Sequence, residues 1–272
     1  FFKALQYRIV EPFAVLESRQ RAALAGYGSR FTWRNSLAEL DGFCGVHFSN
    51  ELIDAMPVHV VRWTGSEWME RHVSVSGESF AFTDAPISNC ALAARLREIP
   101  QPLPDGYQTE VNLAALHWIE SVAAKVKRGF IVAVDYGHPR DLYYAAERRT
   151  GTLQCYAKHR VVPSPLTQPG RSDITAHVEW TTLAQHAESL GLTLVGFTDQ
   201  HHFITGLLMG EIGREFEGAA DAQARRALQT LLQPTLLGMA FQFLVLGKDA
   251  DEDVQLAGLR FARDRRAVLG LP

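Results

Sequence analysis

The sequence contains few cysteines, and no two of them lie close together in the chain. Cys44, Cys90 and Cys155 are the only three among 272 residues, and no CxxC pair occurs. Zinc sites and disulfide frameworks need closely spaced or paired cysteines, so we predict neither and expect a reducing compartment. The ten histidines show no HExxH or other zinc-binding spacing, and no metal site is predicted.

Long hydrophobic runs and an excess of positive charge are also absent. No uninterrupted apolar stretch reaches the ~18 residues that a membrane helix needs, and no signal-peptide pattern is visible. The formal net charge is −3, which gives no global basic field. We therefore expect no nucleic-acid partner and no membrane insertion. The composition is 47% hydrophobic and 21% charged, which is ordinary for one large globular domain.

Strand and helix patterns alternate along most of the chain. Pro12 suits the first turn of a helix, and Asn112 can cap a helix that Gly129 ends. Alternation of this kind favours an α/β fold with a parallel, doubly wound sheet. The strand candidates are residues 7–10, 31–33, 43–48, 130–134, 192–197 and 240–246, and the helix candidates are residues 13–25, 92–99, 113–126, 181–190 and 221–233.

Two stretches depart from this alternation. Residues 58–84 hold three β segments separated by Thr64-Gly65-Ser66 and Ser76-Gly77-Glu78, which predicts a β-meander inserted into a single domain spanning residues 1–272. Residues 140–175 are polar and carry several prolines and glycines. A long polar stretch of that kind is more often a functional loop than a scaffold element.

A group of polar residues follows one buried strand candidate. Asn50, Glu51 and Asp54 come directly after the apolar run 43–48, and ligands of open α/β sheets bind just beyond the carboxyl ends of strands. Two carboxylates three residues apart can hold a guanidinium by charge-assisted bonds, or they can act as an acid–base pair. The alternative is a helix cap with solvated acids. The pattern alone leaves these options open.

Two further strand ends carry acidic residues. Glu11 follows the first strand candidate, where an acid can accept hydrogen bonds from ribose hydroxyls or stabilise the dipole of the next helix. Asp135 and Tyr136 follow the most apolar strand, with Gly137 permitting a turn and His138 beyond it. That arrangement indicates either a binding site or an ordinary strand-end turn.

A third polar group lies at residues 173–177. Asp173, Thr175 and His177 share one face if this segment is extended. A metal triad is disfavoured, because no other histidine or acid is placed to complete the ligand shell. His201 and His202 are expected to form a surface or loop pair rather than a ligand set.

Taken in order, these segments resemble the MidA-type family of S-adenosylmethionine-dependent methyltransferases, which includes a mitochondrial complex I assembly factor that methylates an arginine. The likeness runs from about residue 5 to about residue 248. The segments that carry it are Tyr7-Arg8-Ile9-Val10-Glu11-Pro12 with Gln20, Ser49-Asn50-Glu51-Leu52-Ile53-Asp54-Ala55-Met56-Pro57-Val58, Asp135-Tyr136-Gly137-His138, Gly151-Thr152-Leu153 and Asp173-Ile174-Thr175-Ala176-His177-Val178.

The resemblance implies a Rossmann-like class I methyltransferase sheet with helices on both faces, a β-hairpin insertion and a late antiparallel strand, here residues 240–246. It implies S-adenosyl-L-methionine as cofactor, with Glu11 on the ribose and Asn50 near the methionine end. Asn35 is a further cofactor candidate by position alone. The glycine-rich cofactor loop of the family is expected before Phe1.

On the acceptor side, the resemblance places Glu51 and Asp54 against the substrate, with Asp135, Tyr136 and His177 as secondary catalytic candidates. The expected substrate is a protein arginine, with a respiratory complex I subunit as the candidate partner. A homodimer is also expected. The implied location is a bacterial cytoplasm, or the mitochondrial matrix if the protein is eukaryotic.

Two other functions compete with this hypothesis. A nicotinamide-dependent oxidoreductase uses a similar sheet with an acid after its second strand, although no Tyr-x-x-x-Lys or comparable hydride-transfer group is evident here. A non-catalytic assembly protein could keep the fold and bind a partner through the insertion. Trp63, Trp68, Phe80 and Phe82 could form such a surface, but we expect them to pack onto the sheet instead.

Overall fold

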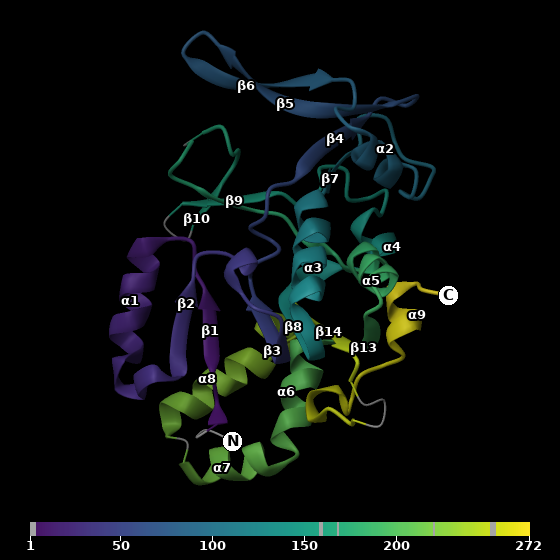
Figure 1. Cartoon of the computed structure of the whole chain (residues 1–272). Coiled ribbons are helices and arrows are strands. Elements are labelled where there is room, and N and C mark those ends of the chain that lie inside the picture. Colours follow the sequence, from purple (N-terminus) through teal and green to yellow (C-terminus); the bar gives the residue numbers. More distant parts are fainter. Residues whose placement is uncertain (1–3, 158–159, 168, 220, 251–253) are drawn as a thin grey trace.

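The structure is a computed structural model that describes residues 4–157, 160–167, 169–219, 221–250 and 254–272. Its central sheet contains four long strands in the order β3 (Phe43–Asn50), β8 (Val126–His138), β14 (Phe241–Lys248) and β13 (Thr193–Asp199) (Figure 1). β3 is parallel to β8, whereas β14 runs antiparallel to both of its neighbours. The short strand β12 (Val178–Glu179) pairs in parallel with the end of β8. The α/β prediction is confirmed, including the antiparallel strand.

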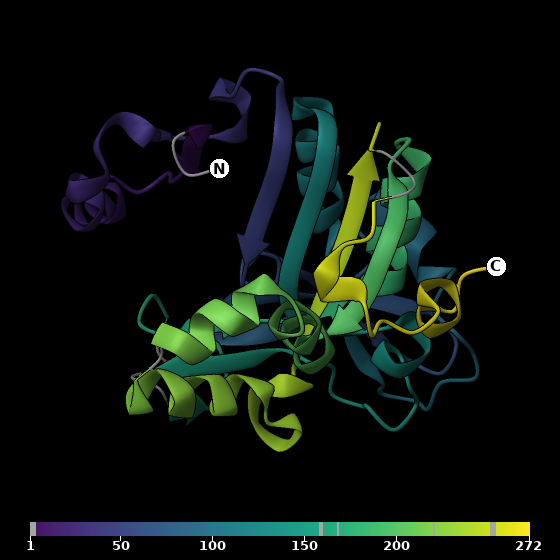
Figure 2. The same ribbon diagram turned by 90° about the horizontal axis from the view of Figure 1, so that it is seen from below.

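Helices cover both faces of this sheet because successive side chains of a strand point to opposite sides. On β8, Ile131 and Ala133 belong to the core under α3 (Leu113–Lys125) and α5 (Trp180–Ser189). Val134 belongs to a second core on the other face, where Phe203 of α6 (Gln200–Leu208) stacks on Phe243. Figure 2 shows α6 grouped with α7 (Glu211–Ala219) and α8 (Ala222–Leu232). The helix α9 (Arg265–Leu269) lies against β13.

The junction between α3 and β8 corrects one expectation. Asn112 caps α3, since its Oδ1 accepts from the Ala115 N–H at 2.8 Å, but the helix ends at Lys125 and β8 begins at the next residue. Gly129 therefore does not end the helix. It lies inside β8 opposite Gly45, where a Cβ would come within 1.9 Å of the Gly45 carbonyl oxygen. Glycine is needed there for a close approach of two backbones.

The N-terminal part forms a separate unit. β1 (Tyr7–Val10) and β2 (Phe31–Arg34) form a parallel pair connected through α1 (Ala14–Leu24). Within the described residues this pair makes no strand pairing with the central sheet, and Figure 2 shows it standing to one side of β3. The three elements confirm the pattern expected for residues 7–33.

A second, four-stranded antiparallel sheet carries the expected meander. Its order is β6 (Ser79–Ala85), β5 (Trp68–Ser76), β4 (His59–Trp63) and β7 (Gln108–Val111). β7 lies well after residue 84, so this sheet includes a strand that the sequence did not indicate. We call it the accessory sheet. Helix α2 (Cys90–Leu96) packs its buried Leu92 and Leu96 against Val61 of β4.

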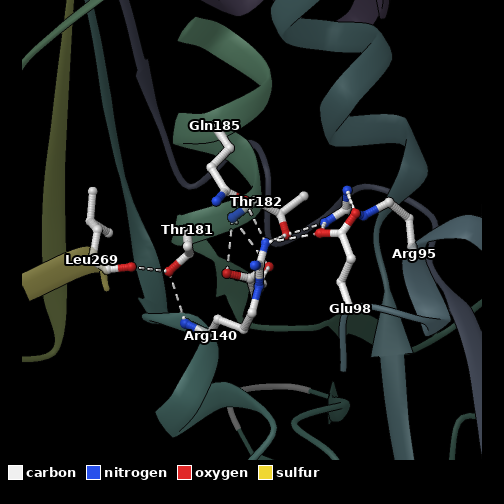
Figure 3. A network of polar contacts seen from close by, with 8 residues as sticks. Arg95, Glu98, Arg140, Thr181, Thr182, Gln185 and Leu269 are labelled. Atoms are coloured by element: carbon white, nitrogen blue, oxygen red, sulfur yellow. Dashed lines mark hydrogen bonds and ion pairs between the residues drawn. The ribbon is translucent and has the colours of Figure 1, made fainter. Parts of the chain in front are cut away.

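An ion-pair network anchors the accessory sheet to the helices of the core (Figure 3). Arg95 of α2 and Arg140 of α4 (Arg140–Tyr143) both donate to Thr182 Oγ1, at 2.7 and 2.9 Å. Glu98 bridges the two guanidinium groups, at 2.6 Å from Arg95 and 3.2 Å from Arg140. Because the arginines come from different elements, the network holds α2 against the start of α5.

Residues 140–175 are not one long loop, as we expected, because they contain regular elements. Besides α4, they form a small antiparallel sheet in the order β10 (Arg160–Val162), β9 (Gln154–Ala157) and β11 (Asp173–Thr175). His201 and His202 are not in a loop either, since they lie half-buried in α6, which Asp199 caps. No helix among the described residues is long and apolar enough to cross a membrane.

Candidate functional site

The candidate site lies where β3 and β8 run side by side toward their carboxyl ends. Asn50 is the last residue of β3 and pairs with Val134 of β8. The chain then leaves the sheet, and the Glu51 N–H donates to the Val134 carbonyl at 3.0 Å. No helix begins between residues 49 and 57, so the alternative of a helix cap is wrong for these acids. They lie on a turn above the neighbouring strand.

Asp135 holds this turn in place. Its side chain is fully buried, and Oδ2 accepts from the backbone N–H groups of Ile53 at 2.9 Å and Asp54 at 3.2 Å. Oδ1 accepts from the Tyr136 N–H at 2.9 Å. Burial, with a further contribution from Asp54, raises the pKa of Asp135 to about 7. The structure thus places Asp135 behind the site, with both oxygens already engaged.

Asp54 lies on the turn next to Asp135, to which its backbone N–H donates. It is buried, and its Oδ1 has no hydrogen-bond partner in the part of the chain that the structure describes. Burial raises its pKa to about 6, and the charges of Glu51 and Asp173 act in the same direction. Its carbonyl accepts from the Ala176 N–H at 2.9 Å. A buried carboxyl atom without a partner is costly for stability, which points to a functional rather than a structural reason for this residue.

Glu51 is the accessible acid of the group. Its side chain is exposed, and Asn50 Nδ2 donates to its Oε1 at 3.1 Å. Its backbone has a φ of 48°, in the left-handed region. A non-glycine residue in that region stores strain of about 1–2 kcal/mol, and such strain is concentrated at functional sites. The turn therefore holds the Glu51 carboxylate in a conformation that local preferences oppose.

Tyr136 and His177 form an aromatic wall beside these acids. Their rings are stacked with centroids 6.4 Å apart, and Tyr136 packs on Phe241 at 4.1 Å. Burial and the charges of Glu51 and Asp54 raise the pKa of Tyr136 to about 12. Burial and the charge of Arg148 lower the pKa of His177. The phenol and the imidazole are both favoured in their neutral forms.

Residues 135–138 do not form a strand-end turn, which was the alternative to a binding site. They belong to β8, which runs to His138, and Gly137 has another role. A Cβ at this position would lie 2.2 Å from the Val178 carbonyl oxygen and 2.6 Å from the Trp180 indole nitrogen. Glycine is required because β12 and Trp180 pack directly on the strand. Burial, together with Arg148 and His177, lowers the pKa of His138 to about 4.

The segment 173–177 reaches the site from β11. Asp173 is exposed and contributes to the raised pKa of Asp54, and the Ala176 N–H binds the Asp54 carbonyl. Among the described residues, no group of three or more histidine, cysteine, aspartate or glutamate side chains could hold a metal ion.

Glu11 and Asn35 lie on the N-terminal unit, apart from the acids. Glu11 Oε1 accepts from the Phe13 N–H at 3.1 Å, and Oε2 accepts from Gln20 Nε2 at 2.9 Å. Each carboxylate oxygen has a second lone pair, so the side chain can still accept bonds from two neighbouring hydroxyls. Asn35 is exposed, and its backbone N–H donates to Glu39 Oε2 at 3.1 Å. Neither residue is hydrogen-bonded to Glu51.

The sequence analysis did not single out one buried residue near the candidate site. Glu110 of β7 is 1% exposed and accepts two hydrogen bonds from Thr152. A single glutamate in a short strand gives no functional signal, because it is expected to face solvent. Only the packing of β7 against residues 151–152 reveals its position.

Comparison with known proteins identifies the class. Residues 1–198 match the profile of a family described as "Putative S-adenosyl-L-methionine-dependent methyltransferase". The chain belongs to this family of S-adenosyl-L-methionine-dependent methyltransferases, which confirms the resemblance noted from the sequence and the cofactor class that it implies. It also makes the oxidoreductase hypothesis wrong.

Two of the similar proteins are named protein arginine methyltransferases. The chain is 23% identical over 239 residues to the Drosophila melanogaster protein arginine methyltransferase NDUFAF7 homolog, mitochondrial, covering 80% of this chain and 51% of the relative. It is 24% identical over 229 residues to the Rattus norvegicus protein arginine methyltransferase NDUFAF7, mitochondrial, covering 80% and 49%. The chain therefore spans about half the length of the curated relatives that it matches.

Solved structures agree with the fold. A Burkholderia thailandensis protein bound to S-adenosyl-homocysteine superposes with a TM-score of 0.85 at 33% identity, over 95% of this chain and 67% of that one. A native crystal structure of a Burkholderia thailandensis protein gives a TM-score of 0.84 at 32% identity, over 95% and 70%. The Rossmann-like methyltransferase fold is therefore confirmed.

Proposed function

We propose that this protein transfers a methyl group from S-adenosyl-L-methionine to an arginine side chain of a protein. The observation that carries the proposal is the exposed Glu51 carboxylate, held by a strained backbone at the carboxyl end of β3 and backed by the buried Asp54. A strand-end turn with one accessible and one buried acid suits a cationic acceptor better than a neutral one.

The cofactor would be held by residues of the N-terminal unit and by the last residue of β3. S-adenosyl-L-methionine supplies an electrophilic methyl group on a sulfonium. We assign its ribose to Glu11, whose oxygens keep free lone pairs, and its methionine end to Asn50, at the end of β3 next to Glu51. Asn35 is carried as a further cofactor candidate because it lies just beyond β2.

The acids would act on the acceptor in two different ways. Glu51 is exposed, so it can bind the guanidinium and concentrate positive charge away from the attacking nitrogen. Asp54, with a pKa of about 6, is a stronger base than an ordinary aspartate and is suited to receive the proton that the nitrogen loses. Asp135 would be a positioning residue, because its oxygens hold the turn rather than face the acceptor.

Tyr136 and His177 would form the wall of the acceptor channel. Their stacked rings lie beside the acids, and both are favoured in their neutral forms. A neutral aromatic surface can contact the apolar stem and the cationic plane of an arginine side chain without charge repulsion.

The nature of the acceptor is supported by the named relatives. The fly and rat proteins are protein arginine methyltransferases, and the acid pair fits a guanidinium. A respiratory complex I subunit is the particular acceptor that we propose from the family resemblance. On this proposal residues 1–272 act as one methyltransferase-like domain, with residues 58–84 as an insertion, in a bacterial cytoplasm or a mitochondrial matrix.

The acceptor class can be tested with a matched peptide pair. The full-length protein is incubated with methyl-labelled S-adenosyl-L-methionine and peptides that differ only by Arg or Lys at one position. We expect label on the arginine peptide, located to the guanidinium by mass spectrometry. Equal labelling of both peptides contradicts the arginine assignment. Binding of S-adenosyl-homocysteine without labelling of any arginine peptide or complex I preparation favours the non-catalytic assembly function.

The expected homodimer is a separate proposal. Among the described residues, the edge strand β6 of the accessory sheet pairs on one side only. Val75 and Phe80, which pair across β5 and β6, are 75% and 48% exposed. Exposed apolar edges are a common site of strand pairing between chains. Light scattering after gel filtration should give a molar mass twice that of one chain. Replacing Phe80 by Lys should reduce the measured mass to that of a single chain.

A further inference from the structure

The accessory sheet reaches the acceptor side of the site through one buried carboxyl group. Glu110 of β7 is 1% exposed, and Oε2 accepts from both the Thr152 N–H at 2.8 Å and the Thr152 hydroxyl at 3.0 Å. Thr152 is itself buried, with 5% of its surface exposed. A buried side chain that satisfies two donors of one residue fixes that residue more strongly than either bond alone.

The same hydroxyl continues the chain of bonds to the site. Thr152 Oγ1 accepts from the His177 backbone N–H at 3.0 Å. A hydroxyl has one proton to donate. Because that proton goes to Glu110, the oxygen is left to accept from His177, and the direction of all three bonds is fixed. The neighbouring Ala176 N–H binds the Asp54 carbonyl at 2.9 Å.

The loop before Thr152 is shaped around the Glu110 carboxyl. Gly151 has a φ of 74°, and a Cβ there would lie 2.1 Å from Glu110 Oε1. Only glycine permits both the left-handed backbone and the contact. The contacts with Glu110 therefore account for a glycine at position 151 and a threonine at position 152. Both belong to one of the segments that carry the family resemblance.

We propose that Glu110 is a positioning residue of the accessory sheet that acts through Thr152 to set the place of residues 176–177, and with them His177 and the Asp54 turn. This inference rests on the proposed function, because His177 and Asp54 matter only if they face an acceptor. It gives the accessory sheet a part in assembling the site, in addition to any role in binding a partner.

The test compares Thr152→Val, Thr152→Ser and Thr109→Val in the full-length protein. Thr152→Val removes the hydroxyl that joins Glu110 to His177, whereas Thr152→Ser retains it. Thr109 lies on the same strand as Glu110 and is also buried, with 0% exposed, but its hydroxyl is outside this chain of bonds. Thr109→Val is therefore a control for the loss of a buried hydroxyl as such.

The first readout is the pKa of the His177 imidazole, which is measured by NMR titration. In the wild type, burial and Arg148 hold it below the ordinary value, beside Tyr136 and His138. Loosening of the segment would hydrate the ring, so in Thr152→Val the pKa should rise toward about 6.5. Thr152→Ser and Thr109→Val should keep the wild-type value.

The second readout is methyl transfer with saturating acceptor. We expect Thr152→Val to lower kcat about ten- to hundredfold through misplacement of the acceptor groups, while the Kd for S-adenosyl-homocysteine stays within about threefold. Thr152→Ser should restore kcat. The proposal is overturned if Thr152→Val keeps both the His177 pKa and kcat, or if Thr109→Val changes them equally. If the wild type transfers no methyl group, the proposed function fails, and the NMR readout still decides the positioning role.

Discussion

Replacing Asp54 by Asn should make the protein more stable at alkaline pH while impairing its activity. In the folded state the pKa of Asp54 is about 6, raised by burial and by Glu51 and Asp173. The ordinary value, near 3.9, applies to the unfolded chain. The folded state therefore binds the proton more tightly than the unfolded chain does. Protonation of Asp54 contributes to the free energy of unfolding at low pH, and this contribution is lost as pH rises through about 6.

The size of the effect follows from this difference in pKa. Between pH 4 and pH 8, the wild type should lose about 2 to 3 kcal/mol of unfolding free energy through Asp54 alone. The amide side chain introduced by Asp54→Asn cannot titrate, so this variant should not show the loss. In the wild type the charge of Asp54 also raises the pKa of Asp135. Without this charge, ionisation of Asp135 should cost less stability, which also favours the variant at pH 8.

The assay is urea unfolding of both proteins at pH 4 and pH 8. For each protein, the unfolding free energy at pH 8 is subtracted from the value at pH 4. Comparing this difference between the variant and the wild type removes any pH-independent effect of the amide on stability. Asp105→Asn, at an exposed turn position, is the control and should change the difference by less than about 0.5 kcal/mol. If Asp54→Asn gains nothing at pH 8 relative to pH 4, then Asp54 is not a buried, poorly solvated acid, and the reasoning fails.

Two further substitutions test the geometry of the strands and the turn. Glu51→Gly should relieve the left-handed backbone at φ 48° and leave the protein as stable as the wild type or up to about 1 kcal/mol more stable, yet inactive; a clear loss of stability in urea unfolding would contradict the strain. Gly129→Ala should cost about 3 kcal/mol or more, because its Cβ would meet the Gly45 carbonyl oxygen at 1.9 Å. Gly77 also has a positive φ, 61° against 132° at Gly129, but open space surrounds it. Gly77→Ala should therefore cost only about 1 kcal/mol, and equal losses in the two variants would show that the collision is not the cause.

Local signals in the sequence were sufficient for most elements of the fold. The cap at Asn112 and the apolar run 130–134 were located correctly, because capping and burial depend on a few neighbouring residues. Gly129 and Gly137 were misjudged for the opposite reason. Their partners, Gly45 and Val178, lie far away in the sequence, and a glycine required for close packing has the same sequence signature as one required for a turn.

The site was predicted in part. Asn50, Glu51, Asp54 and Asp135 do lie together, because polar residues after parallel strands meet at one edge of the sheet. The differences among the acids could not be predicted, because they depend on burial: Glu51 is exposed, Asp54 is buried, and the buried Asp135 accepts hydrogen bonds from the turn. Glu110 was not predicted at all, because it reaches the site from a separate sheet.

The most direct test of the account replaces Glu51 by Gln and measures two quantities on the full-length protein, with the exposed Glu67→Gln as control. Calorimetry with S-adenosyl-homocysteine gives cofactor-site affinity, and labelled methyl transfer to an arginine peptide gives activity. We predict nearly unchanged affinity and a loss of activity of about a hundredfold or more in Glu51→Gln, with both quantities retained in Glu67→Gln. Wild-type turnover in Glu51→Gln would contradict the assignment of this turn to the acceptor.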